Sequence, residues 1–288
     1  MIHPNDGGQV GKTNAHYRIL GKLGEGGMLL TSIGGLWLPI WFCYVFVSCS
    51  NPREQIVGNP ERMTRIPKLV LWAWERPEDL RFINSQQVGV AFLAKTIVLR
   101  GRQVIERPRL QPLRVNPGTP LIGVIRFESS MDEPSTLDSN VCEETVASVL
   151  QVASMKGLHA IQIDFDARVS ERSFYSRVVR IVRHKLPDTL GLSITALTSW
   201  CFGDRWLESL PVDEAVPMLF RMGADHHSIV QRLSAGETFE PAVCKGSLGI
   251  SMDEFPRSLP HGRRTYVFNP LPWHLDTYTH LIEKLRLQ

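Results

Sequence analysis

Two carboxylates stand at the end of an apolar stretch in the middle of the chain. Ile161 and Ile163 alternate with smaller or polar residues, and Asp164 and Asp166 follow directly. Because the side chains of a strand point alternately to its two faces, both acids are expected on one face. The helix-like segment Ser173–Lys185 comes next. The acids should therefore lie at the carboxyl end of a strand that leads into a helix, where active sites of β/α folds are found. Solvated acids that cap a strand, or an Asp bonded to nearby backbone amides, are the alternative.

Eight short apolar runs predict the strands of the fold that positions these acids. They are Leu69–Trp74, Val88–Leu93, Leu121–Phe127, Ala160–Phe165, Leu190–Leu197, Ala215–Phe220, Ser247–Met252 and Thr265–Phe268. Helical patterns occupy Pro77–Ser85, Glu143–Met155, Ser173–Lys185 and Asp276–Arg286. Apolar strands that alternate with helices indicate a parallel sheet, and eight of them predict an α/β fold of the (β/α)8 TIM-like barrel type, slightly irregular. Prolines between Leu99 and Thr119 forbid a regular helix, so the second strand is expected to continue as a hairpin.

The predicted strand ends carry mostly acids and tryptophans. Besides Asp164 and Asp166, the candidate catalytic acids are Glu128 and Glu75. The candidate ligand-binding residues are Trp72, Trp74, Trp200, Arg221, Asn269 and Trp273. Carboxylates supply the acid, base or nucleophile in glycoside cleavage, and flat indole rings can stack on the C–H faces of sugars. The alternative is that the tryptophans cap the barrel core and that the charges form ion pairs, such as Arg126 with Glu128.

Residues 1–66 are expected to lie outside the barrel, which should occupy residues 67–288. Leu29–Ser48 carries no charge and is long enough to cross a bilayer. With Cys49 it ends in a sequence that resembles the bacterial lipobox, in which the cysteine is lipidated. We therefore interpret residues 29–49 as a lipoprotein signal, with an uncleaved anchor as the first alternative and a buried core helix as the last. Either of the first two would place the rest of the chain outside the cytoplasm, at the cell envelope, with residues 50–66 as a linker.

A second feature precedes that segment. His16–Met28 resembles the first strand and the glycine-rich loop of bacterial serine/threonine kinases. The strand lysine, the His-Arg-Asp loop and the Asp-Phe-Gly motif of kinases do not follow it. We therefore interpret residues 1–28 as a fused remnant or as the product of a start codon placed too far upstream, without kinase activity.

Composition excludes several classes of function. A hydrophobic content of 43% and a charged content of 21% are ordinary for a globular protein. A net charge of +3 without a run of Lys or Arg gives no indication of nucleic-acid binding. The body contains Cys142, Cys201 and Cys244 without Cys-x-x-Cys spacing, so these cysteines are expected to be small buried apolar residues rather than a disulfide framework or a zinc site. We expect no cofactor.

Several motifs resemble a bacterial family known only as domain of unknown function 3142. The resemblance spans roughly residues 66–287 and rests on Leu71–Leu80, Gln162–Ala167, Ser193–Leu197 with Ser199–Cys201, Pro217–Met218 with Phe220–Gly223, and Tyr266–Asn269. It implies a TIM-barrel body related to glycoside hydrolases, without an established reaction. The fourth strand is also similar to the Asp-x-Asp-x-Glu strand of chitinase-like hydrolases. The glutamate of that motif is the proton donor, and this chain has Arg168 in its place.

Three functions fit these residues. The first is an extracytoplasmic glycosidase in which Asp166 reacts, Asp164 supports it, and Glu128 or Glu75 supplies a second acid, with Glu254 as a weaker candidate. The second is a barrel that binds a saccharide without cleaving it, which Arg168 favours. The third is metal-dependent hydrolysis, which is disfavoured because no His-x-His or His-Glu-x-x-His occurs.

Overall fold

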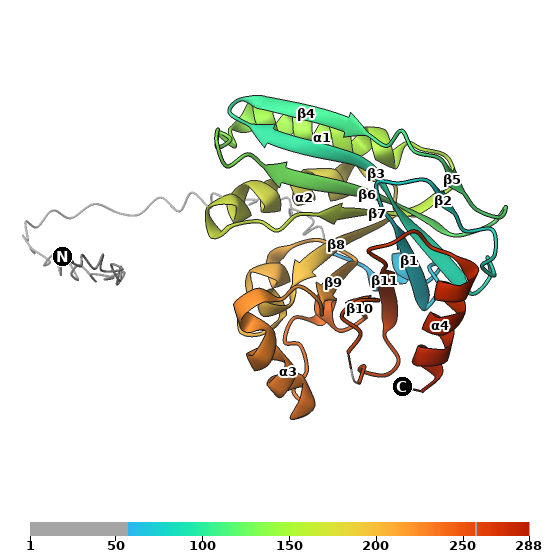
Figure 1. Ribbon diagram of the computed structural model, residues 1–288. Helices are drawn as coiled ribbons and strands as arrows, with labels where there is room; N and C mark the ends of the chain where they lie inside the picture. The colour runs from blue at the N-terminus through green and yellow to red at the C-terminus, as the bar shows by residue number, and fades with distance from the viewer. Residues whose placement is uncertain (1–56, 257, 288) are drawn as a thin grey trace, which may run out of the picture. The chain divides into compact units, whose positions relative to one another are not determined.

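Eight parallel strands close into a barrel in the computed structural model (Figure 1), which describes residues 57–256 and 258–287. The strand order around the barrel is β1, β3, β6, β7, β8, β9, β10 and β11, and β1 pairs with both β3 and β11 to close it. Their bounds are β1 Leu69–Ala73, β3 Val88–Arg100, β6 Leu121–Ser129, β7 Leu158–Asp164, β8 Gly191–Leu197, β9 Glu214–Met218, β10 Ser247–Ser251 and β11 Arg264–Phe268. All eight predicted strands and the predicted TIM-like barrel are confirmed.

The second barrel strand differs most from its predicted length. β3 continues to Arg100, turns at Gly101 with φ of +53°, and pairs antiparallel with β4 (Gln103–Pro108). This hairpin confirms the expectation drawn from the prolines. It replaces the helix that would follow the second strand of a regular barrel.

In the described part of the chain, four α-helices pack outside the barrel: α1 Ser139–Ala153, α2 Arg172–Lys185, α3 His226–Ser234 and α4 Leu275–Arg286. The sequence predicted α1, α2 and α4. α1 begins before its apolar pattern because the side chain of Asp138 accepts a hydrogen bond from the Val141 amide at 3.1 Å and so caps the helix. α3 was not predicted; it is nine residues long, and only Ile229 in it is buried.

The helix predicted over Pro77–Ser85 is wrong. Glu78–Asp79 forms the short strand β2 instead, which pairs with β5 (Leu113–Arg114). The buried Glu78 carboxylate accepts hydrogen bonds from the Arg76 side chain at 2.9 Å and from the Trp273 amide at 2.9 Å. These contacts hold the segment in an extended conformation that local propensity does not predict.

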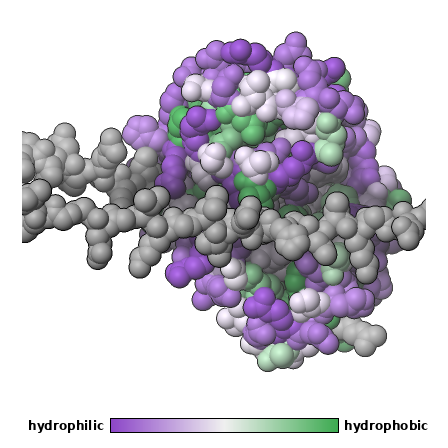
Figure 2. All heavy atoms as spheres, turned by 90° about the vertical axis from the view of Figure 1, so that its left-hand side faces the viewer, coloured by the Kyte–Doolittle hydropathy of each residue, from purple (hydrophilic) through white to green (hydrophobic). Residues whose placement is uncertain are grey.

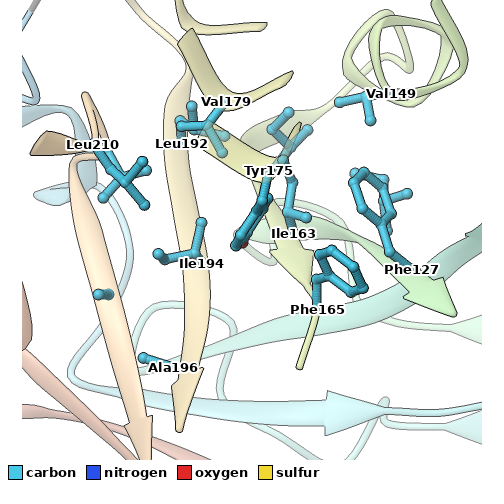
Figure 3. Close-up of a cluster of buried hydrophobic side chains, with 14 of the residues drawn as sticks. Phe127, Val149, Ile163, Phe165, Tyr175, Val179, Leu192, Ile194, Ala196 and Leu210 are labelled. Atoms are coloured by element: carbon cyan, nitrogen blue, oxygen red, sulfur yellow. The ribbon is translucent and has the colours of Figure 1, made fainter. Parts of the chain in front are cut away.

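The hydrophobic core has an outer and an inner part. In the outer part, Figure 3 shows side chains of the strands meeting side chains of the helices, for example Phe165 against Tyr175. The inner part fills the barrel and includes Val70, Val124 and Tyr266. Barrel strands buried on both faces explain the near-continuous apolar runs of the sequence.

A chain of buried polar side chains also crosses the barrel interior. The Trp72 indole donates to Gln162 Oε1 at 2.9 Å, and Gln162 Nε2 donates to Ser193 Oγ at 3.1 Å. The Ser193 hydroxyl donates to Glu214 at 3.4 Å, and the Tyr266 hydroxyl donates to the same carboxylate at 2.7 Å. Arg264 pairs with Glu214 from the opposite side. The charges are thus compensated, as buried polar groups require.

Two of the three body cysteines form a disulfide, contrary to the expectation from their spacing. Cys201 and Cys244 are joined across a sequence separation of 43, and both are fully buried. The bond connects the 3-10 helix η3 (Thr198–Cys201) after β8 with the 3-10 helix η6 (Ala242–Cys244) before β10. Local spacing could not predict it, because only the closed barrel brings these two loops together. Cys142 is buried and not disulfide-bonded.

Polar residues dominate the described surface on the face shown in Figure 2, with smaller groups of hydrophobic residues between them. Over residues 57–256 and 258–287, no helix combines the length and the apolar character needed to cross a membrane. The predicted kinase-like segment, the Leu29–Ser48 segment and Cys49 lie outside the described residues.

Candidate functional site

A cavity of about 290 Å³ opens at the carboxyl ends of the barrel strands. Its lining divides into two chemically different walls. The polar wall comes from β6, β7 and β8 and includes Arg126, Asp164, Asp166 and Thr195. The aromatic wall comes from β1, β11 and the end of β9 and consists of Trp72, Trp74, Phe220 and Phe268. A largely apolar cavity with a few converging polar groups is the usual form of a small-molecule site.

Asp164 is the last residue of β7 and points into the cavity. The Thr195 hydroxyl on β8 donates a hydrogen bond to Asp164 Oδ1 at 2.7 Å. Burial raises the pKa of Asp164 to about 6, against the Thr195 hydrogen bond, which lowers it. This value also includes the charges of Asp166 and Glu128, which raise the pKa, and that of Arg126, the register partner of Asp164 on β6, which lowers it.

Asp166 lies two residues further along and lines the same cavity, as the strand period predicted. Its side chain is more exposed than that of Asp164. Burial raises the pKa of Asp166, and the charge of Arg126 lowers it. Asp164 is the less exposed of the two, so burial favours its neutral form more strongly, and Asp164 retains a proton to higher pH than Asp166. One strand end thus carries two acids with different tendencies to ionise, which is typical of acid–base sites.

The aromatic wall is built from interlocking rings. Phe220 and Phe268 stack with a centroid distance of 5.9 Å and an interplanar angle of 3°. Trp74 meets Phe268 edge-on at 6.1 Å, and Trp72 meets Phe220 edge-on at 6.3 Å. Trp72 lies over Gly249, where a Cβ atom would approach the indole to 2.9 Å, so this position needs glycine. The rings together offer a rigid apolar face of the kind that packs against sugar C–H groups.

Two arginines connect the walls. The guanidinium of Arg126 lies 6.0 Å from the Trp74 ring and forms an ion pair with Glu128 at 3.3 Å. Arg221 lines the cavity and has a φ of 52°, in the left-handed region that non-glycine residues rarely adopt. Its amide donates to Glu254 at 2.8 Å, and its guanidinium donates to Asp253 at 3.2 Å. The residues after β10 therefore hold Arg221 at the rim.

The other predicted acids lie outside the cavity. Glu128 borders an adjoining groove of about 380 Å³, which shares Arg126, Asp164 and Asp166 with the cavity. Arg168, at the place of the chitinase glutamate, also borders the groove. Glu75 is exposed and accepts a hydrogen bond from the Thr96 hydroxyl at 3.3 Å.

Three of the predicted binding residues do not line the cavity. Trp200 is 4% exposed and packs edge-on against Trp206 at 5.0 Å. Trp273 is 2% exposed, and its indole donates to the Trp72 carbonyl at 2.9 Å. Asn269 is 3% exposed and donates to the Pro272 carbonyl at 3.2 Å. These three residues follow strands, where the chain turns. Their positions in the sequence therefore did not show whether their side chains point into the cavity.

The cavity also contains residues that were missed. Asp225, directly before α3, supplies a carboxylate from a different element. Phe220 and Phe268 were within predicted strands but were not singled out. The two-residue period could have identified Phe268, which falls on the same strand face as the inward Tyr266. Over the described residues, no group of three or more His, Cys, Asp or Glu side chains is arranged to hold a metal ion.

No curated protein matches the chain. Among solved structures, the Bacillus cereus spore cortex-lytic enzyme SleL is similar with 18% identity and a TM-score of 0.42 over 66% of this chain. The chain spans about half of SleL, covering 52% of it. A putative chitinase A from Streptomyces coelicolor is similar with 9% identity and a TM-score of 0.44, over 70% of this chain and 92% of that protein. Residues 117–219, which contain β6 to β9 and therefore Asp164, Asp166 and Thr195, match the family described as a domain of unknown function, DUF3142, and so confirm over this region the family predicted from the motifs.

Proposed function

We propose that this chain is an extracytoplasmic glycoside hydrolase-like protein that acts on a saccharide through the carboxylates of the cavity. One observation carries the proposal: two acids with different tendencies to ionise face a wall of aromatic rings across one cavity. Glycoside cleavage needs a protonated acid and an ionised carboxylate beside the same bond. Aromatic rings supply the apolar contact that a sugar ring makes on one of its faces.

The roles of the acids follow from their surroundings. Asp166 is the reactive carboxylate, because it is the more exposed of the pair and ionises first. Asp164, held by Thr195, keeps a proton and supports Asp166. Asp225 takes the part of the second acid from another element, since it lines the cavity and Glu128 and Glu75 do not.

A panel of glycans tests this assignment. We expect Asp166→Asn to abolish cleavage and to leave saccharide binding nearly intact, because the amide keeps the shape and loses the acid–base function. Asp225→Asn should reduce turnover strongly, by about 10²-fold or more. Asp276→Asn on the exposed start of α4 is the matched control and should retain full activity. Full activity of Asp166→Asn would refute its role.

A second candidate is a barrel that binds a saccharide without cleaving it. Arg168 favours this function, because it stands where chitinase-like hydrolases carry their proton donor and because it lies outside the cavity. The same panel separates the two functions. If the parent protein cleaves no glycan but some glycans raise its melting temperature, the binding function is supported and the hydrolase is refuted.

We propose further that the barrel is exported and held at the membrane through Cys49 or the Leu29–Ser48 segment. The uncharged segment and the lipobox-like ending support this. The Cys201–Cys244 disulfide adds support, since disulfides persist mainly outside the cytoplasm. Lipid labelling and fractionation of a bacterial host test this proposal. Cys49→Ala should abolish the incorporation of labelled lipid, and a fully cytoplasmic product with an intact Met1 would contradict export.

A further inference from the structure

Tyr175 is buried beside the two site acids without a part in the proposed chemistry. It comes from the first turn of α2 and is fully buried between that helix and the barrel. Its ring packs edge-on against Phe165 at 5.3 Å, and Phe165 is the residue that separates Asp164 from Asp166. In Figure 3 the ring lies between β7 and β8, with its hydroxyl end directed along the strands toward their carboxyl ends.

The Tyr175 hydroxyl is buried and has no hydrogen-bond partner among the described residues. A buried hydroxyl without a partner costs about 1–3 kcal/mol, so a phenylalanine would fill this space at lower cost. Burial and the charges of Asp164 and Asp166 raise the pKa of Tyr175 well above 10. The hydroxyl therefore keeps its proton and remains a donor at every pH at which the site acids titrate.

A second unpartnered donor lies in the same cluster. The Trp206 ring is 6.0 Å from the Tyr175 ring, and its buried Nε1 also lacks a partner. A buried water needs two to four polar partners, and an indole N–H, a phenol and a carboxylate oxygen supply them. On the cavity side, Thr195 binds Oδ1 of Asp164, and no hydrogen bond between described residues reaches its Oδ2.

We propose that Tyr175 is a positioning residue for the site acids, whose hydroxyl donates through one ordered water to Asp164 Oδ2. Thr195 and Tyr175 would then hold the two oxygens of this carboxylate from β8 and from α2. Hydrogen bonds to a carboxylate favour its ionised form, so the contact lowers the pKa of Asp164 against its burial. The effect on turnover rests on the proposed function, whereas the effect on the titration of Asp164 does not.

The test is the titration of Asp164 in the full chain, followed by NMR of aspartate carboxyl carbons and assigned with Asp164→Asn. Tyr175→Phe keeps the ring and its packing, so the variant should fold. We expect the midpoint of Asp164 to rise by about 0.5–1 pH unit. Tyr278→Phe is the matched control, because its ring packs on Phe82 away from the cavity, and it should leave the midpoint unchanged.

The other charged groups near the acids are the same in both variants: Arg126 and Glu128 on β6, Arg168 and Glu171 before α2, Arg172 on α2, Asp204, which pairs with Arg172, and Arg221 and Asp225 between β9 and α3. A changed midpoint is therefore assigned to the hydroxyl. An unchanged Asp164 midpoint in Tyr175→Phe, or a shift of Asp166 alone, overturns the proposal.

Steady-state kinetics provide a second test of the role of Tyr175. If a glycan is cleaved, Tyr175→Phe should raise the pH above which kcat falls by about the same 0.5–1 pH unit, since Asp164 acts in its protonated form, and should leave KM nearly unchanged, because Tyr175 does not line the cavity. If no glycan is cleaved, the proposed hydrolase fails, and the titration still decides the role of Tyr175.

Discussion

The hydroxyl of Thr195 and the carboxylate of Asp164 join two neighbouring barrel strands at the floor of the cavity, at a distance of 2.7 Å. The contact opposes the effect of burial on Asp164, whose pKa nevertheless reaches about 6. A group that titrates near pH 6 can exchange a proton at physiological pH. Together with burial, this hydrogen bond therefore influences the pH at which the site holds its proton.

Thr195→Val should raise the pKa of Asp164 above 6. Valine has nearly the same shape and lacks the donor, so the ionised carboxylate loses a hydrogen bond worth about 1.5–3 kcal/mol. We expect an upward shift of about one pH unit in the Asp164 titration, measured by carboxyl-carbon NMR. Thr279→Val, on the exposed face of α4, is the control. An unchanged midpoint in Thr195→Val would show that the hydrogen bond is not formed in solution.

Asp164→Asn should stabilise the protein at neutral pH. The pKa of Asp164 in the folded state, about 6, lies above its ordinary value of 3.8. The folded state therefore binds more protons between about pH 4 and 6, and the free energy of unfolding falls as the pH rises through this range. The loss amounts to about 3 kcal/mol, which asparagine avoids while it can still accept the Thr195 hydrogen bond. Urea denaturation at pH 4 and pH 7 measures it, and equal gains at both pH values would contradict the argument.

Trp74→Ala and Trp200→Ala should have opposite consequences. Trp74 lines the cavity and is partly exposed, so its loss should weaken saccharide binding by about tenfold and leave stability nearly unchanged. Trp200 is buried against Trp206, so its loss should reduce the free energy of unfolding by about 3–5 kcal/mol. Calorimetry and denaturation of both variants check this. Weaker binding by a stably folded Trp200→Ala would restore the ligand-binding role that the sequence predicted.

Removal of the disulfide should destabilise the barrel and loosen one side of the cavity. Cys201 is the last residue of η3, and Thr198 and Ser199 of the same 3-10 helix line the cavity. We expect Cys201→Ala with Cys244→Ala to lower the free energy of unfolding by about 2–4 kcal/mol. A reducing agent should produce the same loss in the parent protein and none in the double variant. Sensitivity of the double variant to the reducing agent would contradict this explanation.

The sequence predicted the barrel strands better than it predicted the residues that line the cavity. The eight strands follow from apolar runs, because burial on both faces leaves a strong pattern, and the two-residue period placed Asp164 and Asp166 together. Residues beyond the strand ends depend on loops whose direction has no comparable period. For this reason the sequence did not predict that Trp200 and Trp273 lie outside the cavity and that Asp225 lines it.

Long-range contacts account for the remaining differences. The segment after β1 forms β2 instead of a helix because Glu78 contacts Trp273, far away in sequence. The disulfide likewise joins residues 43 apart. Such contacts exist only once the barrel has closed, so the local pattern could not indicate them.

The hairpin of β3 and β4 gives a closed barrel one open sheet edge. β4 pairs with β3 alone, so its outer backbone groups are available to another extended chain. Glu106, Arg107 and Pro108 occupy the end of this strand, where charge and a missing N–H discourage such addition. Apolar residues at these positions would turn the edge into a seed for aggregation. The solubility of engineered variants will therefore depend on this short strand, although it does not line the cavity.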